Sequence, residues 1–173
     1  MNLDEALTRI QKGDEAAFEQ IYRQTEQAVF YIALSVVRDR ALAEDVMQTT
    51  YLNVLRHASS YRRGTNARAW IFRIARNEAL TLKKKRSREE NIDVNEHLPA
   101  FGIVQTDDYG LLTEYAQKVL TEEEFTLVML IAVQGYKRRE IASMTGLPIG
   151  TVTWKYNRAL AKLKRELKGK EGM

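Results

Sequence analysis

Residues 140–164, EIASMTGLPIGTVTWKYNRALAKLK, constrain the fold more than any other segment, because their pattern predicts two short helices joined by a tight turn. Ala142, Gly146 and Val152 stand at relative positions 0, 4 and 10. A helix-turn-helix needs a small residue where its helices cross, a residue that tolerates positive φ in the turn, and an apolar anchor in the second helix. The second helix can then enter a DNA major groove, so the pattern predicts duplex DNA as a partner.

Charged residues are grouped in blocks along the chain. Residues 62–88 contain ten Lys or Arg and one acid, Glu78, whereas residues 89–124 contain ten acids and one base, Lys118. From Lys137 onward there are ten bases and three acids. The net charge of +4 does not by itself indicate nucleic acid, but two basic blocks around an acidic one predict two DNA-facing surfaces with something different between them.

Apolar residues recur with helical spacing along most of the chain, and no segment is rich in β-formers. This predicts an all-α fold of two small helical domains joined by a flexible linker. The first domain is expected at residues 1–86 and the second at residues 111–168. The linker is expected at residues 87–110, which hold Pro99 and two glycines and show no sustained period.

Three long helices are expected to close the first core, the first of them opened by Gly13 and Asp14. They cover residues 18–36, 41–58 and 67–85. The expected inward residues of the second and third are Met47, Tyr51, Val54, Leu55, Ala58, Trp70, Ile71, Ile74, Ala75 and Leu82. In the second domain, helices at 111–120 and 122–134 precede the helix-turn-helix. Thr121 is expected to be the N-cap of the helix at 122–134.

Several protein classes are excluded by what the sequence lacks. It has no cysteine, so it has neither disulfides nor a Cys-based metal site. The first residues do not resemble a signal peptide, and no apolar run approaches the roughly 18 residues of a membrane span. His57 and His97 fit no metal-ligand pattern, and neither a phosphate-binding GxxxxGK nor a catalytic triad is present. We therefore expect a cytoplasmic protein that is not an enzyme and has no cofactor.

The second helix of the helix-turn-helix is expected to present a polar, basic face. Residues early in such a helix point at base edges, and later Lys and Arg residues meet phosphates. The alternative is an ordinary amphipathic C-terminal helix with a solvated basic face. The residues of this face are Thr151, Thr153, Trp154, Lys155, Asn157, Arg158, Lys162, Lys164 and Arg165.

The first basic block interleaves cations with aromatic residues, as single-stranded nucleic acid requires, because cations track phosphates and rings stack on exposed bases. Trp70 fits the apolar stripe of its helix and is expected in the core. Tyr61, in the polar loop 59–66, is the better candidate for a base contact. The alternative is again a solvated positive face. The block also includes Arg62, Arg63, Asn66, Arg68, Phe72, Arg73, Arg76, Asn77 and residues 83–86.

Taken in order, these segments resemble a bacterial RNA polymerase sigma factor of the extracytoplasmic-function (ECF) group of the sigma-70 family, which keeps only regions 2 and 4. The matching segments of region 2 are GDEAAFEQIY, ALAEDVMQTTYLNVLR and ARAWIFRIARNEAL followed by KKKRSR. Region 4 is matched by LTEEEFTLVMLIAVQGYKRREIASMTGLPIGTVTWKYNRALAKLK. The resemblance implies a protein that binds core RNA polymerase and directs promoter-specific initiation.

The resemblance also implies site residues. In this family region 2 docks on the clamp helices of the polymerase β′ subunit, and the residues that match this surface are Glu44, Asp45 and Gln48. The alternative is that they are only the exposed first turn of a helix, where acidic residues are favoured in any case. The residues implied for opening the minus-10 element are Tyr61, Arg62, Arg63, Asn66, Arg73, Arg76, Asn77 and Lys84. Region 4, which also meets the β flap, is implied to read the minus-35 element through Thr151, Thr153, Trp154, Asn157, Arg158 and Lys162, with Arg158 able to reach a guanine or a phosphate.

Two departures from the family pattern concern promoter preference. After Gly-Thr-Val the family has a basic residue followed by Ser-Arg, whereas this chain has Thr153, Trp154 and Lys155. A bulky Trp154 is expected to alter the base preference at minus-35. The loop before Trp70 is short and rich in Arg, which leaves the minus-10 preference open.

Further expectations concern partners and alternatives. The acidic residues 89–124 could imitate nucleic-acid charge in a basic polymerase channel or form a solvated, self-repelling linker. The resemblance implies an anti-sigma partner and a monomer when free. An autonomous helix-turn-helix regulator is the alternative function; its first domain would need a ligand pocket or a dimer seam, and it would not explain the basic, aromatic loop and helix.

Overall fold

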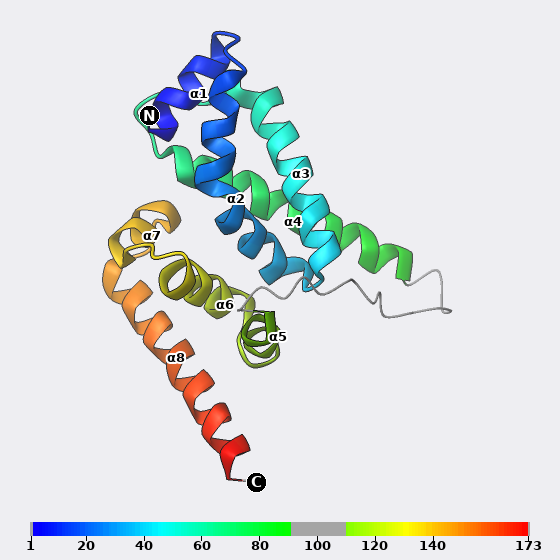
Figure 1. Cartoon of the computed structure of the whole chain (residues 1–173), viewed down its shortest axis with the longest axis vertical. Coiled ribbons are helices and arrows are strands. Elements are labelled where there is room, and N and C mark those ends of the chain that lie inside the picture. Colours follow the sequence, from blue (N-terminus) through cyan, green and yellow to red (C-terminus); the bar gives the residue numbers. More distant parts are fainter. Residues whose placement is uncertain (1, 91–109, 173) are drawn as a thin grey trace. The chain divides into compact units, whose positions relative to one another are not determined.

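The computed structural model describes residues 2–90 and 110–172, which are mainly helical and contain no strand (Figure 1). The helices fall into two compact units, one with α1–α4 and the other with α5–α8. The expected all-α class is therefore confirmed. Most of the predicted linker, residues 91–109, lies outside the described residues. None of the described helices has the length and hydropathy that a bilayer span requires.

The first unit is a bundle of three long helices closed at one end by a short one. Helices α2 (Ala16–Val37), α3 (Arg40–His57) and α4 (Ala67–Glu90) each pack against the other two, and α1 (Leu3–Gln11) packs mainly on α2. A single 3-10 turn, η1 (Ala58–Ser60), follows α3. The core is filled mainly by aliphatic side chains such as Leu7, Ile21, Val29, Val36, Val54 and Ile71, which are at most 1% exposed.

A sharp connection sets the antiparallel course of α2 and α3. Arg38 ends α2 in the left-handed region, at φ 57°, and its amide bonds the carbonyl of Leu34. Asp39 then caps α3 by accepting a hydrogen bond of 2.9 Å from the amide of Leu42. The reversal therefore takes only two residues, which keeps the two helices in contact along their length.

The first unit differs from the sequence expectations in three places. The segment before Gly13 forms a helix, α1, in addition to the three long helices that were expected. Helix α4 continues to Glu90, so the first four residues of the expected linker are helical. Leu55 is 39% exposed, because the buried stripe of α3 runs through Val46, Thr50 and Val54 and leaves Leu55 at its edge. The expectation that Leu55 points inward is wrong.

The second unit contains the helix-turn-helix. Helix α5 (Gly110–Val119) is followed by α6 (Glu122–Val128), which continues as a π-helical turn, η2 (Met129–Val133). The motif itself is α7 (Arg138–Thr145) and α8 (Ile149–Glu171). Thr121 caps α6 as expected, within a capping box that also uses Glu124.

The turn of the motif has the geometry that its sequence predicts. Gly146 ends α7 at φ 72°, where its amide bonds the carbonyl of Ala142. Val152 is fully buried and anchors α8 in a core that includes Phe125, Met129 and Ile141. Because a side chain at φ 72° would be strained, the turn needs its glycine.

Candidate nucleic-acid interface

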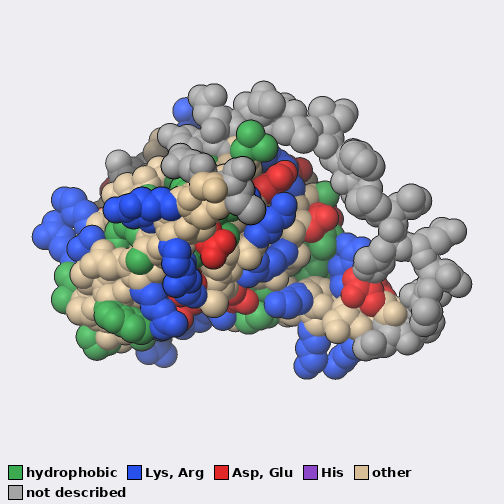
Figure 2. All heavy atoms as spheres, turned by 90° about the horizontal axis from the view of Figure 1, so that it is seen from below, with side chains coloured by type: hydrophobic (Ala, Val, Ile, Leu, Met, Phe, Trp, Pro, Cys, Tyr) green, Lys and Arg blue, Asp and Glu red, His purple; other side chains and the backbone are tan. Residues whose placement is uncertain are grey.

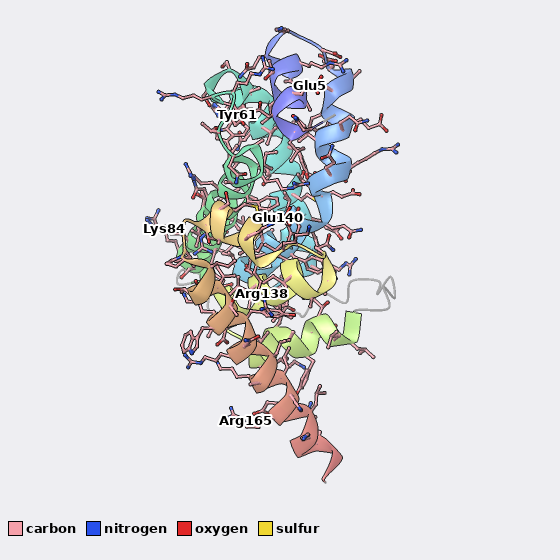
Figure 3. The ribbon with its side chains drawn as sticks, turned by 90° about the vertical axis from the view of Figure 1, so that its left-hand side faces the viewer. Glu5, Tyr61, Lys84, Arg138, Glu140 and Arg165 are labelled. Carbon is pink, nitrogen blue, oxygen red and sulfur yellow. The ribbon has the colours of Figure 1, made fainter. Side chains whose placement is uncertain are left out.

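The outer face of α4 is a stripe of basic and amide side chains. Arg73, Arg76, Asn77 and Lys84 are all exposed. Their spacing of three, four and seven residues places them on one side of the helix. Figure 3 shows Lys84 extending away from α4. An exposed basic stripe of this kind is suited to a phosphate backbone.

The loop of residues 58–66, here called the Arg loop, leads from α3 into this stripe. The side chains of Arg62 and Arg63 are exposed at its tip. The loop bends at Gly64, which has φ 82°, and Asn66 ends it by accepting a hydrogen bond of 3.0 Å from the amide of Ala69. Asn66 was expected to contact DNA, and its carboxamide oxygen caps α4.

Tyr61 lies inside the Arg loop, and the expectation that it presents its ring to a base is not met in this conformation. The residue is only 4% exposed. Its hydroxyl donates to Asp4 Oδ1 and lies 3.0 Å from the carbonyl oxygen of Thr65. Its ring packs against Trp70, with the ring centroids 5.5 Å apart. Tyr61 therefore supports the loop from within.

Trp70, which was expected in the core, is half-buried, and Phe72, which belongs to the same basic block, is 8% exposed. Neither residue offers a free ring face comparable to that of Trp154 in the second unit. The aromatic component of the first basic block is therefore structural.

On α8 the side chains divide between the core and the solvent. Val152, Ala159 and Leu163 face the core, and Thr151 and Thr153 are partly buried at the start of the helix. Trp154, Asn157 and Arg158 are exposed. The exposed side of α8 can meet a DNA groove, although Nε of Arg158 also lies 4.0 Å from a carboxylate oxygen of Glu124.

Trp154 and Arg158 form a stacked pair on this exposed side. The indole is 58% exposed, and the guanidinium carbon of Arg158 lies 5.2 Å from its ring centroid. Such cation–π contacts between residues four apart fix the direction of an arginine side chain. The guanidinium therefore has a defined position on the surface of the helix.

Lys162 was expected to contact DNA, and its ammonium group is instead bound within the second unit. Its Nζ lies 2.7 and 2.8 Å from the two carboxylate oxygens of Glu124, a residue that is only 8% exposed. Lys155 is bound similarly, 2.7 Å from Glu123. The basic face of α8 is thus smaller than the sequence indicates.

The carboxylate of Glu124 is charged because of these contacts. Burial alone would raise its pKa, but the hydrogen bonds from Lys162 and from the amide of Thr121 hold the pKa below its usual value. The last acids of the block 89–124 are therefore structural groups of α6. They do not belong to a solvated linker.

Helix α3 exposes a third surface. Glu44, Asp45 and Gln48 are exposed, and Glu44 pairs with Arg40 at 3.5 Å. Leu52 is 60% exposed and follows Gln48 by one helical turn, so these residues share a face. Leu55 continues the same face one turn further. An apolar patch beside acidic and amide groups is typical of a protein-docking surface.

Neither Leu52 nor Leu55 could be identified as a functional residue from the sequence. Helical periodicity predicts on which face of the helix a leucine lies, but it cannot distinguish a leucine in the core from an exposed leucine that binds another protein. The only available signal was the position of Leu52 three and four residues from polar neighbours. It was too weak to separate the two.

A cavity of about 180 Å³ lies between α3 and α4, lined by residues that include Asp45, Glu78 and Lys85. Ligand pockets usually measure about 300–1,000 Å³. Within residues 2–90 and 110–172, no group of three or more His, Cys, Asp or Glu side chains could hold a metal ion. This cavity gives no support to a ligand-sensing first domain.

Comparison with known proteins identifies both units. The sigma-70 region 2 family matches residues 21–89, and the sigma-70 region 4 family matches residues 118–163. The RNA polymerase sigma factor CarQ of Myxococcus xanthus is 30% identical over 172 residues, which cover 94% of this chain and 95% of CarQ. The ECF RNA polymerase sigma factor SigM of Mycobacterium tuberculosis is 26% identical over 90% of this chain and 79% of its own length.

Two solved structures are also similar. CnrH, in complex with the cytosolic domain of CnrY, superposes with a TM-score of 0.69 at 21% identity over 96% of this chain and 97% of its own, which supports the fold. The sigma factor RpoE from Bartonella quintana, in complex with the anti-sigma factor NepR, has a TM-score of 0.63 at 27% identity over 87% of this chain and 96% of its own.

Proposed function

Because the chain belongs to the sigma-70 family as an ECF sigma factor that directs promoter-specific transcription initiation, we propose how its exposed surfaces divide that task. The observation that carries the proposal is the presence, in one chain, of an exposed basic loop and helix on region 2 and a helix-turn-helix with exposed reading residues on region 4. Lys and Arg side chains are spread over the face seen in Figure 2, as a DNA-binding protein requires.

The region 2 unit opens the minus-10 element. Arg62 and Arg63 of the Arg loop and the stripe of Arg73, Arg76 and Lys84 hold the phosphates of the separated strand, and Asn77 on the same stripe is positioned to bond a base edge. Extruding a base costs a few kcal/mol of stacking, which phosphate and base contacts recover. Tyr61 and Asn66 act indirectly, by shaping the loop and capping α4.

The region 4 unit reads the minus-35 duplex through the start of α8. Thr151, Thr153, Trp154, Asn157 and Arg158 supply base contacts, and the stack on Trp154 directs Arg158 toward one position in the groove. Lys162 contributes indirectly, because its ion pair with Glu124 fixes α8 to α6. The side chains of Lys164 and Arg165 are exposed and available to phosphates.

The exposed face of α3 binds core RNA polymerase. Asp45 and Gln48, with Glu44 beside them, supply polar contacts to the β′ clamp helices, and Leu52 and Leu55 supply the apolar part. Region 4 additionally meets the β flap. The same surfaces suit an anti-sigma partner, since RpoE, a relative in structure, was solved with one. The free chain is a cytoplasmic monomer without catalytic activity of its own.

Run-off transcription tests this assignment. Purified chain and core polymerase are incubated with a library of promoters, and the transcripts are sequenced to recover the elements used. We expect initiation from a defined set with conserved minus-35 and minus-10 elements. If the chain directs initiation from none of them and does not co-purify with core polymerase, the alternative of an autonomous regulator is the better one.

Replacing Trp154 by Ser is expected to change the base preference at minus-35 more than the overall affinity. The change frees Arg158 from its stack, and an altered base contact is worth about 1–3 kcal/mol, or roughly 5- to 150-fold in discrimination. The measurement is binding of holoenzyme to a randomised minus-35 library before and after the change.

Leu160→Ser is the matched control, because Leu160 is a 38% exposed apolar residue on another face of α8. It should leave the preference unchanged. A uniform loss of affinity across all sequences in the Trp154 variant would instead indicate that the indole serves packing.

A further inference from the structure

We propose that helix α1 is a positioning element for promoter opening: Asp4 and Gln11 fix the backbone of the Arg loop, so that Arg62 points away from α1 and Arg63 is held beside α1 with its side chain exposed. The inference rests on the proposed function of that loop. Helix α1 precedes the segment matched by sigma-70 region 2, which begins at residue 21.

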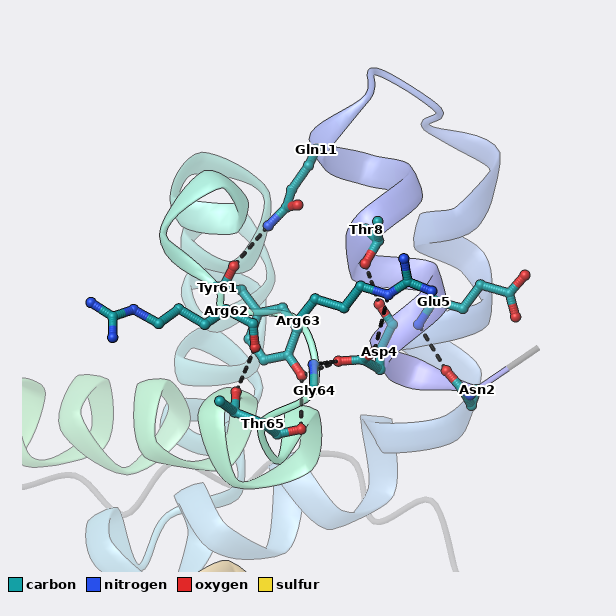
Figure 4. A network of polar contacts seen from close by, with 10 residues as sticks. All are labelled: Asn2, Asp4, Glu5, Thr8, Gln11, Tyr61, Arg62, Arg63, Gly64 and Thr65. Atoms are coloured by element: carbon teal, nitrogen blue, oxygen red, sulfur yellow. Dashed lines mark hydrogen bonds and ion pairs between the residues drawn. The ribbon is translucent and has the colours of Figure 1, made fainter.

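Asp4 binds the far side of the Arg loop. Its Oδ1 accepts a hydrogen bond from the Tyr61 hydroxyl and another, of 2.9 Å, from the amide of Gly64. Its Oδ2 lies 3.8 Å from Nε of Arg63. One carboxylate therefore contacts three residues within four positions of the loop, including Gly64 at the bend (Figure 4).

Gln11 binds the near side of the same loop. Its Nε2 donates to the carbonyl oxygen of Ala58 at 2.8 Å and to that of Tyr61 at 2.9 Å. Both hydrogens of the carboxamide are thus used. Asp4 and Gln11 are seven residues apart, which is two helical turns, so both project from one face of α1.

Helix α1 is itself firmly held, which a positioning element requires. Leu3, Ala6 and Leu7 are at most 6% exposed in the core. Asn2 caps the helix through the amide of Glu5 at 2.8 Å, and Arg9 forms an ion pair with Asp14 beyond its C-terminal end. The two loop-binding side chains therefore start from fixed points.

The protonation states of Asp4 and Tyr61 are consistent with the hydrogen bond between them. The hydrogen bond from Tyr61, followed by that from the Gly64 amide, lowers the pKa of Asp4. Burial, followed by the bond to Asp4, raises the pKa of Tyr61. At neutral pH the proton stays on the phenol and the carboxylate keeps its charge, so the loop receives a charge-assisted contact.

This contact affects promoter opening through the population of the loop conformation. When only a fraction of molecules has a binding-competent conformation, the apparent affinity falls by that fraction. A loop held by α1 already has its DNA-binding conformation in the free protein. A loop released from α1 must be ordered by the DNA itself.

The test compares Asp4→Ala with Glu5→Ala in reconstituted holoenzyme. Both changes remove one negative charge from α1, but the side chain of Glu5 points away from the Arg loop in Figure 4. We expect Asp4→Ala to reduce open-complex formation about tenfold, the worth of one charge-assisted hydrogen bond, and Glu5→Ala to leave it unchanged. Binding to a minus-35 duplex alone should be unaffected by either.

Asp4→Asn provides a rescue that a purely electrostatic role would not allow. Its carboxamide oxygen can still accept from Tyr61 and Gly64, so opening should recover in part although the charge is gone, because a neutral acceptor bonds more weakly than a carboxylate. Amide hydrogen exchange of Gly64 in the free chain reports the loop directly, and we expect it to be faster in Asp4→Ala only.

Two results would overturn the inference. One is equal opening by Asp4→Ala and Glu5→Ala while the wild type opens promoters normally. The other is unchanged exchange at Gly64 in an Asp4→Ala variant that keeps the wild-type melting temperature. If the wild-type holoenzyme opens no promoter at all, the proposed function of the loop fails instead, and the exchange measurement still decides whether α1 orders it.

Discussion

Replacing Leu52 by Asp is expected to weaken binding to core RNA polymerase by about 30-fold or more, while the fold stays intact. Leu52 is 60% exposed on α3, one turn beyond Gln48. In the proposed complex its side chain is buried, so the substitution removes apolar contact and places an unpaired carboxylate in the interface. A truncated or mispaired interface residue of this kind costs about 2 kcal/mol or more, which corresponds to the stated loss.

The measurement is a titration of labelled chain with core polymerase. Leu167→Asp is the matched control, because Leu167 is also an exposed leucine, at 47%, but lies near the end of α8. The unfolding temperature of both variants should match that of the wild type, since neither leucine is in a core. Equal affinities for the two variants would remove Leu52 from the polymerase interface.

Replacing Lys162 by Met is expected to destabilise the region 4 unit by about 2–3 kcal/mol, because it leaves the carboxylate of Glu124 buried without its main partner. For a unit of this size the change lowers the melting temperature by roughly 10 °C. Calorimetry of the full chain measures it, and the transition of region 2 should not move.

Lys164→Met is the control for charge, since Lys164 is exposed on the same helix. It should alter stability by less than about 0.5 kcal/mol. Adding Glu124→Gln to Lys162→Met should restore part of the loss, because the amide oxygen can keep the capping box without a buried charge. If Lys162→Met and Lys164→Met behave alike, the ion pair does not stabilise region 4.

The ion pair between Lys162 and Glu124 makes the stability of the region 4 unit depend on pH, and the sign of this dependence is known. The folded-state pKa of Glu124 is lowered, so its contribution is present above the unfolded-state pKa and is lost as the pH falls through the folded-state pKa. The wild-type region 4 unit should therefore lose stability on acidification. In Lys162→Met this loss should be smaller.

The parts of the fold that could be predicted from the sequence are those set by neighbours in the chain. The turn at Gly146, the anchor Val152 and the cap Thr121 each depend on residues within one or two helical turns. Amphipathic periodicity likewise gave the long helices. It could not give the end of α4, because no proline or glycine marks it near Lys85.

The unexpected burial of Tyr61 and the internal ion pair of Lys162 come from contacts between distant residues. Tyr61 is turned inward by Asp4, which is 57 residues away, and Lys162 is bound by Glu124, which is 38 residues away. A tyrosine in a polar loop and a lysine on a basic helix look exposed when only their neighbours are considered. Leu55 was misplaced because periodicity alone does not give the width of a buried stripe.

The two tryptophans give the chain a pair of built-in optical reporters. Trp70 is half-buried against Tyr61 in region 2, and Trp154 stands exposed beside Arg158 in region 4. Because each unit has one indole in a different environment, their emission differs in wavelength and in access to a soluble quencher. The two promoter contacts can therefore be followed separately in an unlabelled chain, and the order in which they form can be timed.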